Sequence, residues 1–469
     1  MPINSFLYPG PSNSNPYVVD NSCMFNDGDS AFLSKTFSGD GTSHDIGTVS
    51  FWLKRGELGA EQGIFTAGAS TRNFIRIESN DTLTFRSVGD SFHLQTTQVF
   101  RDPSSWYSII IAWDTSQGTA SDRVNFYVNG TQVTAFGTAT YPAQNLDIKL
   151  GAAELNCIGK DSEQTTPYFD GYLSEFVYID GQQLTPTSFG EFDADSPTIF
   201  KPKAIALTFG TNGFYLDFED SGDLGDDESG NGNDFAETNL AATDQASDSP
   251  TNNFCTLNPL TKRAGGTLSE GNLKYTAATT DSSVFGTIGI PPGMKVYFEV
   301  KLVNNTAQNA IGIHNLYDGG DGAFVKGGSG AGTYSYKVRG GSTVTQYYNN
   351  GSSTDTSISN YSNDTIIGVA VDNENGQIHY SADGTYINSS DPTDNDPVAL
   401  VTGFGGASEQ YIHTSLDTTT SMPSNEFNFG NPPFSISSGN ADADGYGNFE
   451  YAVPSGYYAL CTKNLAEYG

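Results

Sequence analysis

Apolar and polar residues alternate along much of the chain with a period of two, which is the pattern of half-buried β-strands. In residues 365–386, Ile367, Val369 and Val371 fall on one face of a predicted strand, and apolar residues recur after a turn. The pairs Asn375-Gly376 and Asp383-Gly384 supply the positive φ angles that tight turns need. This stretch therefore predicts a β-hairpin that serves as scaffold.

The first half of the chain repeats this pattern. In residues 48–56, Val49, Phe51 and Leu53 share one face of a predicted strand, and Trp52 takes the other. A continuous apolar run is typical of a strand in the centre of a sandwich. Further predicted elements are the apolar run at 106–114, a hairpin at 73–87 about Asn80-Asp81, a run at 123–133 that turns on Asn129-Gly130, and a run at 168–186 that carries Leu173 and Phe176 inward and then turns at Asp180-Gly181.

The length and composition predict two domains of β structure. The chain has 469 residues, too many for one ordinary core, with 53 Gly, 20 Pro and 12% aromatic residues. We therefore predict an all-β fold of two antiparallel β-sandwich (jelly-roll type) domains in series. The predicted boundaries are an extended N-terminal arm at 1–22, a first sandwich at 23–235, a polar linker at 236–256 and a second sandwich at 257–469.

Four motifs follow one another in the first half: SFWLKRG, WYSIIIAWD, NFYVNG and YFDGYLSEFVYIDGQQLTP. As a set they resemble the laminin-G-like, concanavalin A-like jelly rolls, over roughly residues 20–200. The stretch DESGNGNDF (227–235) resembles a phrase that usually opens such domains, although here it follows the body. Either a returning strand has been transferred to the C-terminal end, or this stretch is a capping loop.

The motifs of the second half resemble those of SPRY domains. They are KVYFEVKLVNNTAQNAIGIH (295–314), IIGVAVDNENGQIHYSADG (366–384), FNFGNPPF (427–434) and VPSGYYAL (453–460). The resemblance covers about residues 270–462, and it implies a β-sandwich used for recognition.

The formal net charge of -33, from 54 acidic and 21 basic residues, excludes two classes of partner. Phosphate backbones and anionic membranes repel a chain with this much negative charge. We therefore expect no nucleic-acid partner. The longest apolar run, SIIIAW at 108–113, is too short to span a bilayer, so we expect no membrane insertion. An excess of acid also keeps a protein soluble, which is the plainer interpretation.

The four cysteines, Cys23, Cys157, Cys255 and Cys461, have no C-x-x-C spacing, which leaves zinc and redox motifs unsupported. The opening MPINSFLYPG has neither the basic start nor the apolar core of a secretory signal. We expect synthesis in a reducing cytoplasm with free thiols. A disulfide between Cys255 and Cys461 stays open.

The sequence contains no recognisable catalytic motif. It has no G-x-S-x-G elbow and no phosphate-binding loop, and its five histidines lie singly. We predict no catalytic residue and no enzymatic activity. Two acids about 5 to 10 Å apart suffice for a glycosidase, however, and with 54 acids a chance pair is expected.

The acidic run DFEDSGDLGDDESGNGND (217–234) is the best candidate metal site, because calcium takes six to eight hard oxygen ligands, often from a loop. The alternative is a solvated loop whose Asp and Asn side chains cap turns. The candidate calcium ligands are Asp217, Asp220, Asp223, Asp226, Asp227, Asn231 and Asp234.

Two loops of the second half are candidates for ligand binding, since sandwich folds recruit the loops at one end. They are the glycine-rich segment 317–332 and the aromatic segment 345–353. Adjacent tyrosines in a strand face opposite sides, so only one could stack on a sugar, and either could be core instead. The candidate ligand-binding residues are Asp318, Asp321, Tyr347, Tyr348 and Asn349.

The paired sandwiches, the acidity and the Pro/Asn-rich arm together resemble a virion surface protein of a bacteriophage. That resemblance implies a non-enzymatic tail fibre or capsid-surface fibre, made in the host cytoplasm, whose loops bind a host glycan or a partner protein. The arm would attach it to other virion proteins. A homo-oligomer is expected, with a trimer among the candidates. A polysaccharide-degrading enzyme on a jelly roll and a bacterial surface adhesin are the alternatives.

Overall fold

The chain divides into two compact units between Asn252 and Asn253. The structure is a computed structural model, and each unit is described by itself. It describes residues 17–469 except residues 90, 164–165, 264, 279–281, 306–307, 316–332, 340–344, 351, 357–359, 395–400, 405–407 and 418–421.

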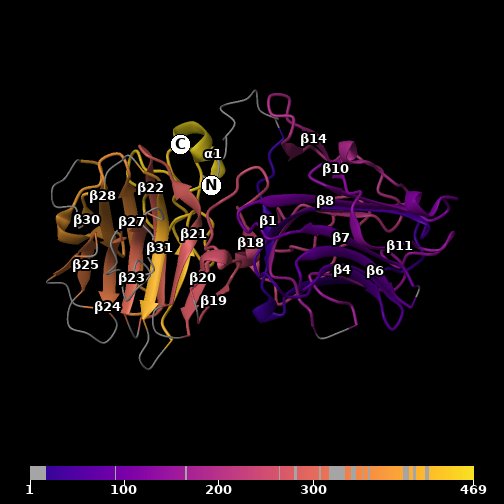
Figure 1. Ribbon diagram of the computed structural model, residues 1–469, viewed down its shortest axis with the longest axis horizontal. Helices are drawn as coiled ribbons and strands as arrows, with labels where there is room; N and C mark the ends of the chain where they lie inside the picture. The colour runs from indigo at the N-terminus through magenta and orange to yellow at the C-terminus, as the bar shows by residue number, and fades with distance from the viewer. Residues whose placement is uncertain are drawn as a thin grey trace. The chain divides into compact units, whose positions relative to one another are not determined.

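The first unit, residues 17–252, is a sandwich of two antiparallel sheets (Figure 1). Sheet A runs in the order β10 (Thr131–Gln132), β9 (Val124–Val128), β8 (Trp106–Asp114), β3 (Ile46–Arg55), β13 (Gly171–Asp180), β1 (Ser22–Phe25) and β18 (Gln245–Ala246), with β16 (Phe214–Leu216) also paired to β13. Sheet B runs β11 (Phe136–Thr140), β7 (His93–Val99), β6 (Thr82–Val88), β5 (Arg72–Ile77), β4 (Gln62–Gly68), β12 (Leu155–Ile158), β2 (Phe32–Thr36) and β17 (Ala236–Thr238). A separate hairpin joins β14 (Gly190–Phe192) to β15 (Phe200–Pro202).

The core of the first unit lies between its two sheets, as the period-two pattern predicts. Val49, Phe51 and Leu53 of β3 point into it, whereas Trp52 belongs to an apolar cluster on the opposite face of sheet A. Phe51 and Phe176 stack with their ring centroids 5.2 Å apart. The predicted facing of this strand is therefore confirmed.

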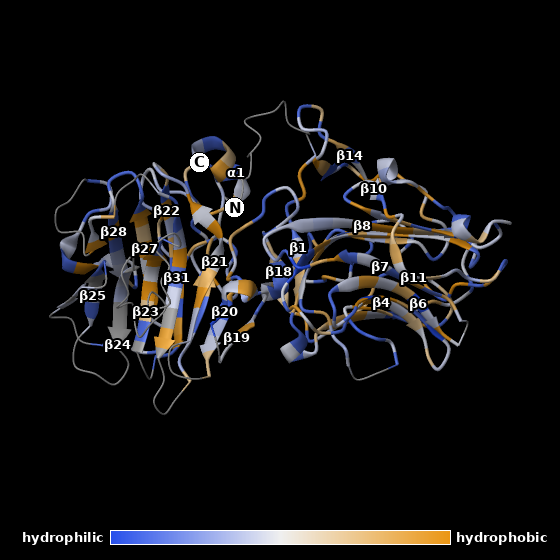
Figure 2. Cartoon of the chain, in the orientation of Figure 1, coloured by the Kyte–Doolittle hydropathy of each residue, from blue (hydrophilic) through white to orange (hydrophobic). Residues whose placement is uncertain are grey.

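The second unit, residues 253–469, is also a sandwich of two antiparallel sheets. Sheet C runs β19 (Gly266–Ser269), β20 (Lys274–Ala277), β32 (Ser424–Asn428), β22 (Lys295–Asn304), β27 (Ile366–Asp372), β28 (Gln377–Ala382) and β29 (Thr385–Tyr386), with β30 (Val401–Thr402) paired to β28. Sheet D runs β21 (Ser282–Ile290), β31 (Gln410–Asp417), β23 (Gln308–His314), β24 (Thr333–Arg339), β25 (Gln346–Asn349) and β26 (Ser352–Asp355). Figure 2 shows apolar segments along the strands of both units and mostly polar colouring in the connecting loops. The all-β prediction is confirmed.

Helical structure is confined to short segments in the part of the chain that the structure describes. The one α-helix there is α1 (Thr462–Tyr468). The 3-10 turns are η1 (Asp27–Asp29), η2 (Ala120–Asp122), η3 (Pro186–Ser188), η4 (Ala242–Asp244), η5 (Pro259–Thr261) and η7 (Ile387–Ser389). Among the described residues no helix has the length and apolar character needed to cross a membrane.

The glycine turns confirm most of the predicted hairpins and correct one of them. Asn129-Gly130 joins β9 to β10 with φ angles of 46° and 74°, and Asp383-Gly384 joins β28 to β29 with 45° and 77°. The loop between β27 and β28, however, has four residues, since Asp372 pairs with Gln377. The Asp372 carboxylate accepts hydrogen bonds from the backbone N–H groups of residues 374 and 375, which stabilises this wider loop. Gly376 has a positive φ there, whereas Asn375 does not.

The predicted linker 236–256 and the predicted arm 1–22 are both corrected by the structure. Strand β17 pairs with β2, and β18 pairs with β1, so residues 236–252 complete the first sandwich. Residues 253–256 belong to the second unit, where Cys255 donates its backbone N–H to the carbonyl of Leu460. Residues 17–22 pack on the first unit, and the rest of the predicted arm lies outside the described residues. In the described parts of both segments polar side chains hydrogen-bond within the fold, as Tyr17 does to Glu175 and Ser249 to the carbonyl of Val19.

The stretch 227–235 forms a loop, and the strand that returns to the sandwich follows it as β17. Phe235, at the end of the loop, is buried in the core. The four cysteines are all buried, and none forms a disulfide. Cys255 and Cys461 do lie on neighbouring segments, as the sequence suggested, but no disulfide joins them.

We expect Gly376→Ala to destabilise the second unit more than Gly293→Ala does. A Cβ on Gly376, where φ is 67°, would lie 1.7 Å from the carbonyl oxygen of Phe404, whereas a Cβ on Gly293, where φ is 89°, meets no atom within 4 Å. Both variants carry the cost of a left-handed alanine, about 1 to 2 kcal/mol, and only the first adds a backbone clash of about 1 to 3 kcal/mol. Hydrogen exchange in β27 and β28 measures the difference. Equal protection in the two variants would contradict the close approach of the Phe404 carbonyl to Gly376.

Candidate functional site

A cavity of about 520 Å³ opens at one end of the first unit. It is lined by residues from three stretches: the segment before β3, the connection between β4 and β5, and the segment before β12. Its polar lining consists of Asp40, His44, Thr71, Asn145, Asp147, Lys149 and Glu154. Leu146 and Ile148 contribute apolar surface. Such a volume is in the usual range for small-molecule sites.

The segment before β3 is held by the last residue of β13. The Asp180 carboxylate accepts backbone hydrogen bonds from Thr42 at 2.6 Å, from Ser43 at 2.9 Å and from Asn212 at 2.9 Å. The amide of Asn212 then donates to the carbonyl groups of Gly39 and Gly151. A carboxylate that accepts several N–H groups fixes a loop firmly, because each bond is charge-assisted.

The segment before β12 is held by two buried asparagines. The side-chain oxygen of Asn73 accepts the backbone N–H of Lys149 at 2.7 Å. Asn156 accepts the N–H of Gly151 and donates to the carbonyl groups of Ala152 and Glu154. The backbone N–H of Ile148 bonds to the carbonyl of His44, which joins the two walls of the cavity. The cavity is therefore preformed.

The cavity is rich in hydrogen-bond acceptors and in negative charge. Partial burial raises the pKa of Asp45, and the neighbouring Asp147 carboxyl raises it further through a hydrogen bond and through its charge. Lys149 forms an ion pair with Glu154 at 2.6 Å, which leaves Asp40 and Asp147 as the uncompensated charges of the lining. The Nε2 atom of His44 is buried, and no described residue hydrogen-bonds to it. The site suits a neutral ligand with several hydroxyl or N–H donors.

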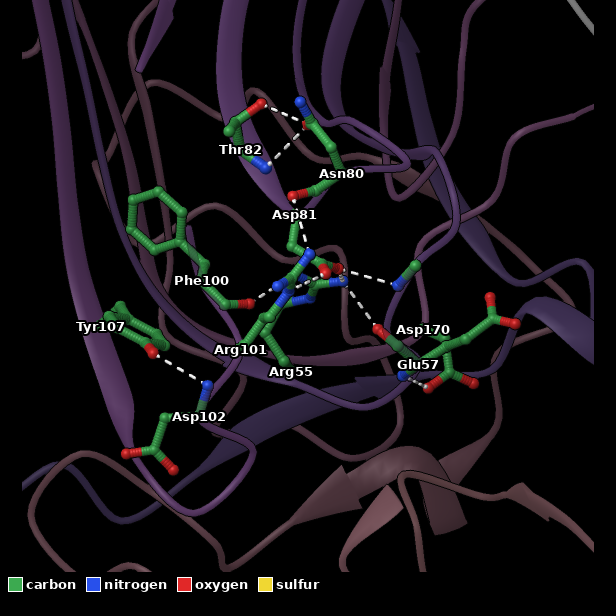
Figure 3. Close-up of polar contacts among 11 residues, drawn as sticks. Arg55, Glu57, Asn80, Asp81, Thr82, Phe100, Arg101, Asp102, Tyr107 and Asp170 are labelled. Carbon is green, nitrogen blue, oxygen red and sulfur yellow. Dashed lines mark hydrogen bonds and ion pairs between the residues drawn. The ribbon is translucent and has the colours of Figure 1, made fainter. Parts of the chain in front are cut away.

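A second polar cluster lies at the opposite end of β3 (Figure 3). The buried guanidinium group of Arg55 donates to the carbonyl of Phe100 at 2.8 Å and to that of Glu57 at 2.7 Å. The Asp81 carboxylate contacts Arg55 at 3.4 Å and Arg101 at 2.6 Å. These contacts join three loops, the connections β3–β4, β5–β6 and β7–β8. Arg55 is buried and its hydrogen bonds tie the loops together, so we interpret this cluster as structural.

Asp170, the residue before β13, lies beside this cluster in Figure 3. Its Oδ1 accepts the backbone N–H of Glu57 at 2.8 Å. Burial raises the pKa of Asp170 to about 8, with further increases from the charges of Asp27 and Glu57. The carboxyl is therefore protonated over most of the neutral range.

The structure describes three of the five predicted ligand-binding residues in whole or in part. Tyr347 is half-buried and packs against the core of the second unit, and the side-chain oxygen of Asn349 accepts the backbone N–H of Thr402 at 2.9 Å. Tyr348 lies in β25, with its side chain outside the description. Asp318 and Asp321 lie outside the described residues. Tyr347 and Asn349 thus contribute to the fold.

The seven predicted calcium ligands lie together in the loop between β16 and β17. Asp227 accepts backbone N–H groups from Tyr215, Ser229 and Asn233, and Asn231 donates to two carbonyl groups. Asp217, Asp220, Asp223 and Asp234 each accept one backbone N–H group. Within the described residues no three His, Cys, Asp or Glu side chains are grouped to hold a metal ion. The turn-capping interpretation thus accounts for these contacts, and calcium binding stays a prediction.

The cavity itself was not predicted from the sequence. Its lining comes from residues 40–44, 71 and 145–154, which carry only the signals of loops. The residues that hold it, Asp180 and Asn156, bond to partners that are up to about 140 positions away in the chain. The Asp-Gly pair at 180–181, which predicted a turn, was the one feature of the sequence that indicated structure near the cavity.

Residues 27–187 match the family model of the concanavalin A-like lectin/glucanases superfamily. The resemblance of the first half is confirmed. No curated protein matches the chain.

The solved structures to which parts of the chain are similar include three of low sequence identity. A heptameric SAP-like pentraxin from Limulus polyphemus is 19% identical, with 38% of this chain and 76% of that one covered and a TM-score of 0.26. The SPRY domain of human HERC1 is 14% identical, with 36% of this chain and 96% of that one covered and a TM-score of 0.27. A putative carbohydrate binding protein from Bacteroides ovatus is 14% identical, with 48% of this chain and 59% of that one covered and a TM-score of 0.32.

We expect Asp170→Asn to stabilise the first unit at high pH and to have little effect at low pH. The pKa of Asp170 is about 8 in the folded chain and about 4 in an unfolded one, so the folded state holds an extra proton between these values. Stability conferred by this group is full below pH 4 and is lost as the pH rises toward 8. Asparagine cannot ionise, and it keeps the oxygen that accepts the N–H of Glu57.

Urea unfolding followed by tryptophan fluorescence measures this effect, because all three tryptophans lie in the first unit. The exposed Asp122→Asn on the same unit is the control. A difference between Asp170→Asn and wild type that is the same at pH 5 and pH 9 would show that Asp170 is not buried as a neutral acid.

Proposed function

We propose that the chain is a non-enzymatic glycan-binding protein whose binding site is the cavity at the end of the first sandwich. The observation that carries the proposal is the preformed cavity of about 520 Å³ with carboxylate, amide and hydroxyl groups on its walls. The superfamily that residues 27–187 match is named for lectins and glucanases, which supports the same ligand class.

The chemistry of the walls supports a neutral sugar. Carboxylate oxygens accept charge-assisted hydrogen bonds from sugar hydroxyls, and Asp40 and Asp147 offer such oxygens without a cation beside them. Asn145 can both donate and accept, and Leu146 gives the C–H face of a ring an apolar contact. The negative charge disfavours sulfated and carboxylated glycans, which would lie against Asp147.

The acids near the cavity support binding more than catalysis. A glycosidase holds its two carboxyl groups about 5 to 10 Å apart, on either side of the bond to be broken. Asp45 and Asp147 instead share a hydrogen bond, and Glu154 is engaged by Lys149. We therefore propose recognition without hydrolysis.

We also propose that this recognition takes place on a virion surface, on a tail fibre or capsid-surface fibre of a bacteriophage. The support is the resemblance in residue pattern together with the acidic composition and the Pro/Asn-rich arm. A homo-oligomeric fibre would present several cavities at once, and avidity would then multiply weak sugar contacts.

We expect Asp147→Ala to weaken glycan binding about tenfold to a hundredfold, since a hydrogen bond to a charged group contributes about 1.5 to 3 kcal/mol. A glycan array with the full chain first identifies the ligand, and calorimetry then compares wild type with the variant. The exposed Asp122→Ala, outside the cavity, is the matched control. Unchanged affinity in Asp147→Ala would remove the cavity from the proposal. Release of reducing ends by the wild type would show an enzyme.

The virion location has its own test. Mass spectrometry of purified phage particles from an infected culture that expresses this chain is expected to find it in the particles. Its presence in the host envelope of uninfected cells, and its absence from particles, would favour the bacterial adhesin.

A further inference from the structure

Lys54 and Asp248 form a buried ion pair on the outer face of sheet A. Lys54 is in β3, and Asp248 follows β18, the strand that pairs with β1 at the sheet's edge (Figure 1). The Nζ atom of Lys54 lies 2.5 Å from Oδ2 of Asp248, and the two side chains are 1% and 0% exposed. No other Lys–acid pair among the described residues is so completely buried on both sides.

The surroundings of this pair are apolar and largely aromatic. An apolar cluster on the same face contains Trp52, Trp106, Tyr172 and Phe200, and Trp52 stacks on Phe200. Nζ of Lys54 lies 5.7 Å from the centre of the Tyr172 ring. Removing two charges from water in such a place costs several kcal/mol per ion.

The two oxygens of Asp248 are in different situations. Oδ1 accepts a hydrogen bond from the indole N–H of Trp106 at 2.9 Å, while Oδ2 faces the amine. The backbone carbonyl of Asp248 accepts the hydroxyl of Ser22 at 2.6 Å, which fixes the segment against β1. The carboxyl carbon is thereby presented to Nζ with one oxygen held by a donor.

We propose that Lys54 and Asp248 join in an intramolecular isopeptide bond. A proton passes from the Nζ ammonium to Oδ2 along their hydrogen bond, which leaves a neutral amine beside a neutral acid. The Nζ lone pair attacks Cγ, and the charge that develops on Oδ1 is stabilised by the Trp106 N–H. A second proton moves from Nζ to Oδ2, the Cγ–Oδ2 bond breaks and one water leaves. An ammonium and a carboxylate thus become an amide and water, with no other reactant.

The product suits this position in the fold. The amide removes both buried charges and keeps an acceptor for Trp106. It ties β3, in the middle of sheet A, to the segment that follows the last strand of the first unit. A covalent link across so long a stretch of chain restricts the unfolded state strongly.

The test is the mass of the purified full chain under denaturing conditions. We expect it to be lower than the mass of the sequence by one water, about 18 Da, and a protease digest to give one branched peptide containing Lys54 and Asp248. A mass equal to that of the sequence, with the two residues in separate peptides, would overturn the proposal and leave a buried ion pair.

Three variants sharpen this result. Lys54→Arg keeps the positive charge but has no amine that can form the amide, so its mass is expected to equal that of its sequence. Lys35→Arg, elsewhere on the unit, is the control, and its mass is expected to remain one water below that of its sequence. Trp106→Phe removes the N–H donor at Oδ1 and is expected to leave part of the chain unlinked. Full linkage in Trp106→Phe would overturn the role of the indole, and loss of water in Lys54→Arg would place the link elsewhere. The wild-type mass decides the main question even where a variant fails to fold.

Discussion

Strand β13 is buried along all ten of its residues, and the first unit depends on that burial. Leu173, Phe176 and Tyr178 point into the core between the sheets, whereas Tyr172 and Val177 lie in apolar clusters on the other face. A strand with two apolar faces needs cover on both. Sheet B covers one face, and the β14–β15 hairpin with the neighbouring loops covers the other, through residues such as Phe200 and Phe189. The unit is therefore a sandwich with an added outer layer.

The ends of β13 determine what the loops around them do. Asp170 at its beginning receives one N–H and is kept neutral by burial, whereas Asp180 at its end receives three N–H groups and fixes the loop at the cavity. Between them, Glu175 has a φ of 49° at an irregularity in the pairing with β3, and its carboxylate accepts the hydroxyl groups of Tyr17 and Tyr215. Burial raises the pKa of Glu175 to about 7. Three buried acids, one directly before β13 and two within it, thus hold three separate parts of the unit.

The sequence was sufficient for features that depend on local periodicity. The facing of Val49, Phe51 and Leu53 follows from alternation, because a shift of one residue would turn all three to the opposite face of the sheet. The Asn129-Gly130 turn follows from the φ angles that only a few residues adopt readily. The tight turn predicted from Asn375-Gly376 was wrong. The Asp372 carboxylate accepts two backbone N–H groups there and stabilises a wider loop of residues 373–376. A side chain outside the turn decided its length.

The cavity could not be predicted because its parts meet only through contacts that are distant in the sequence. Asn73 positions Lys149, and Asp180 positions Thr42. Neither contact can be recognised in the local pattern of apolar and polar residues. His379 is a related case: it faces away from the core of the second unit, as alternation requires, yet it is buried, since it pairs with Ala370 beneath an outer apolar cluster. Alternation gives the face of a strand and says nothing of what covers that face.

The outer layer also explains why the polar segment before residue 253 resembled a linker. Ser249 and Thr251 donate their hydroxyl groups to the carbonyl of Val19, and Thr251 accepts the N–H of Val19. A segment that covers a sheet needs few apolar residues of its own when the sheet supplies them, and it needs polar side chains to satisfy the backbone that it approaches. Asp248 belongs to this segment, and Trp52, Trp106 and Tyr172 on the same face belong to the sheet. Its burial with Lys54 is thus a consequence of where the covering layer meets the outward face of β3.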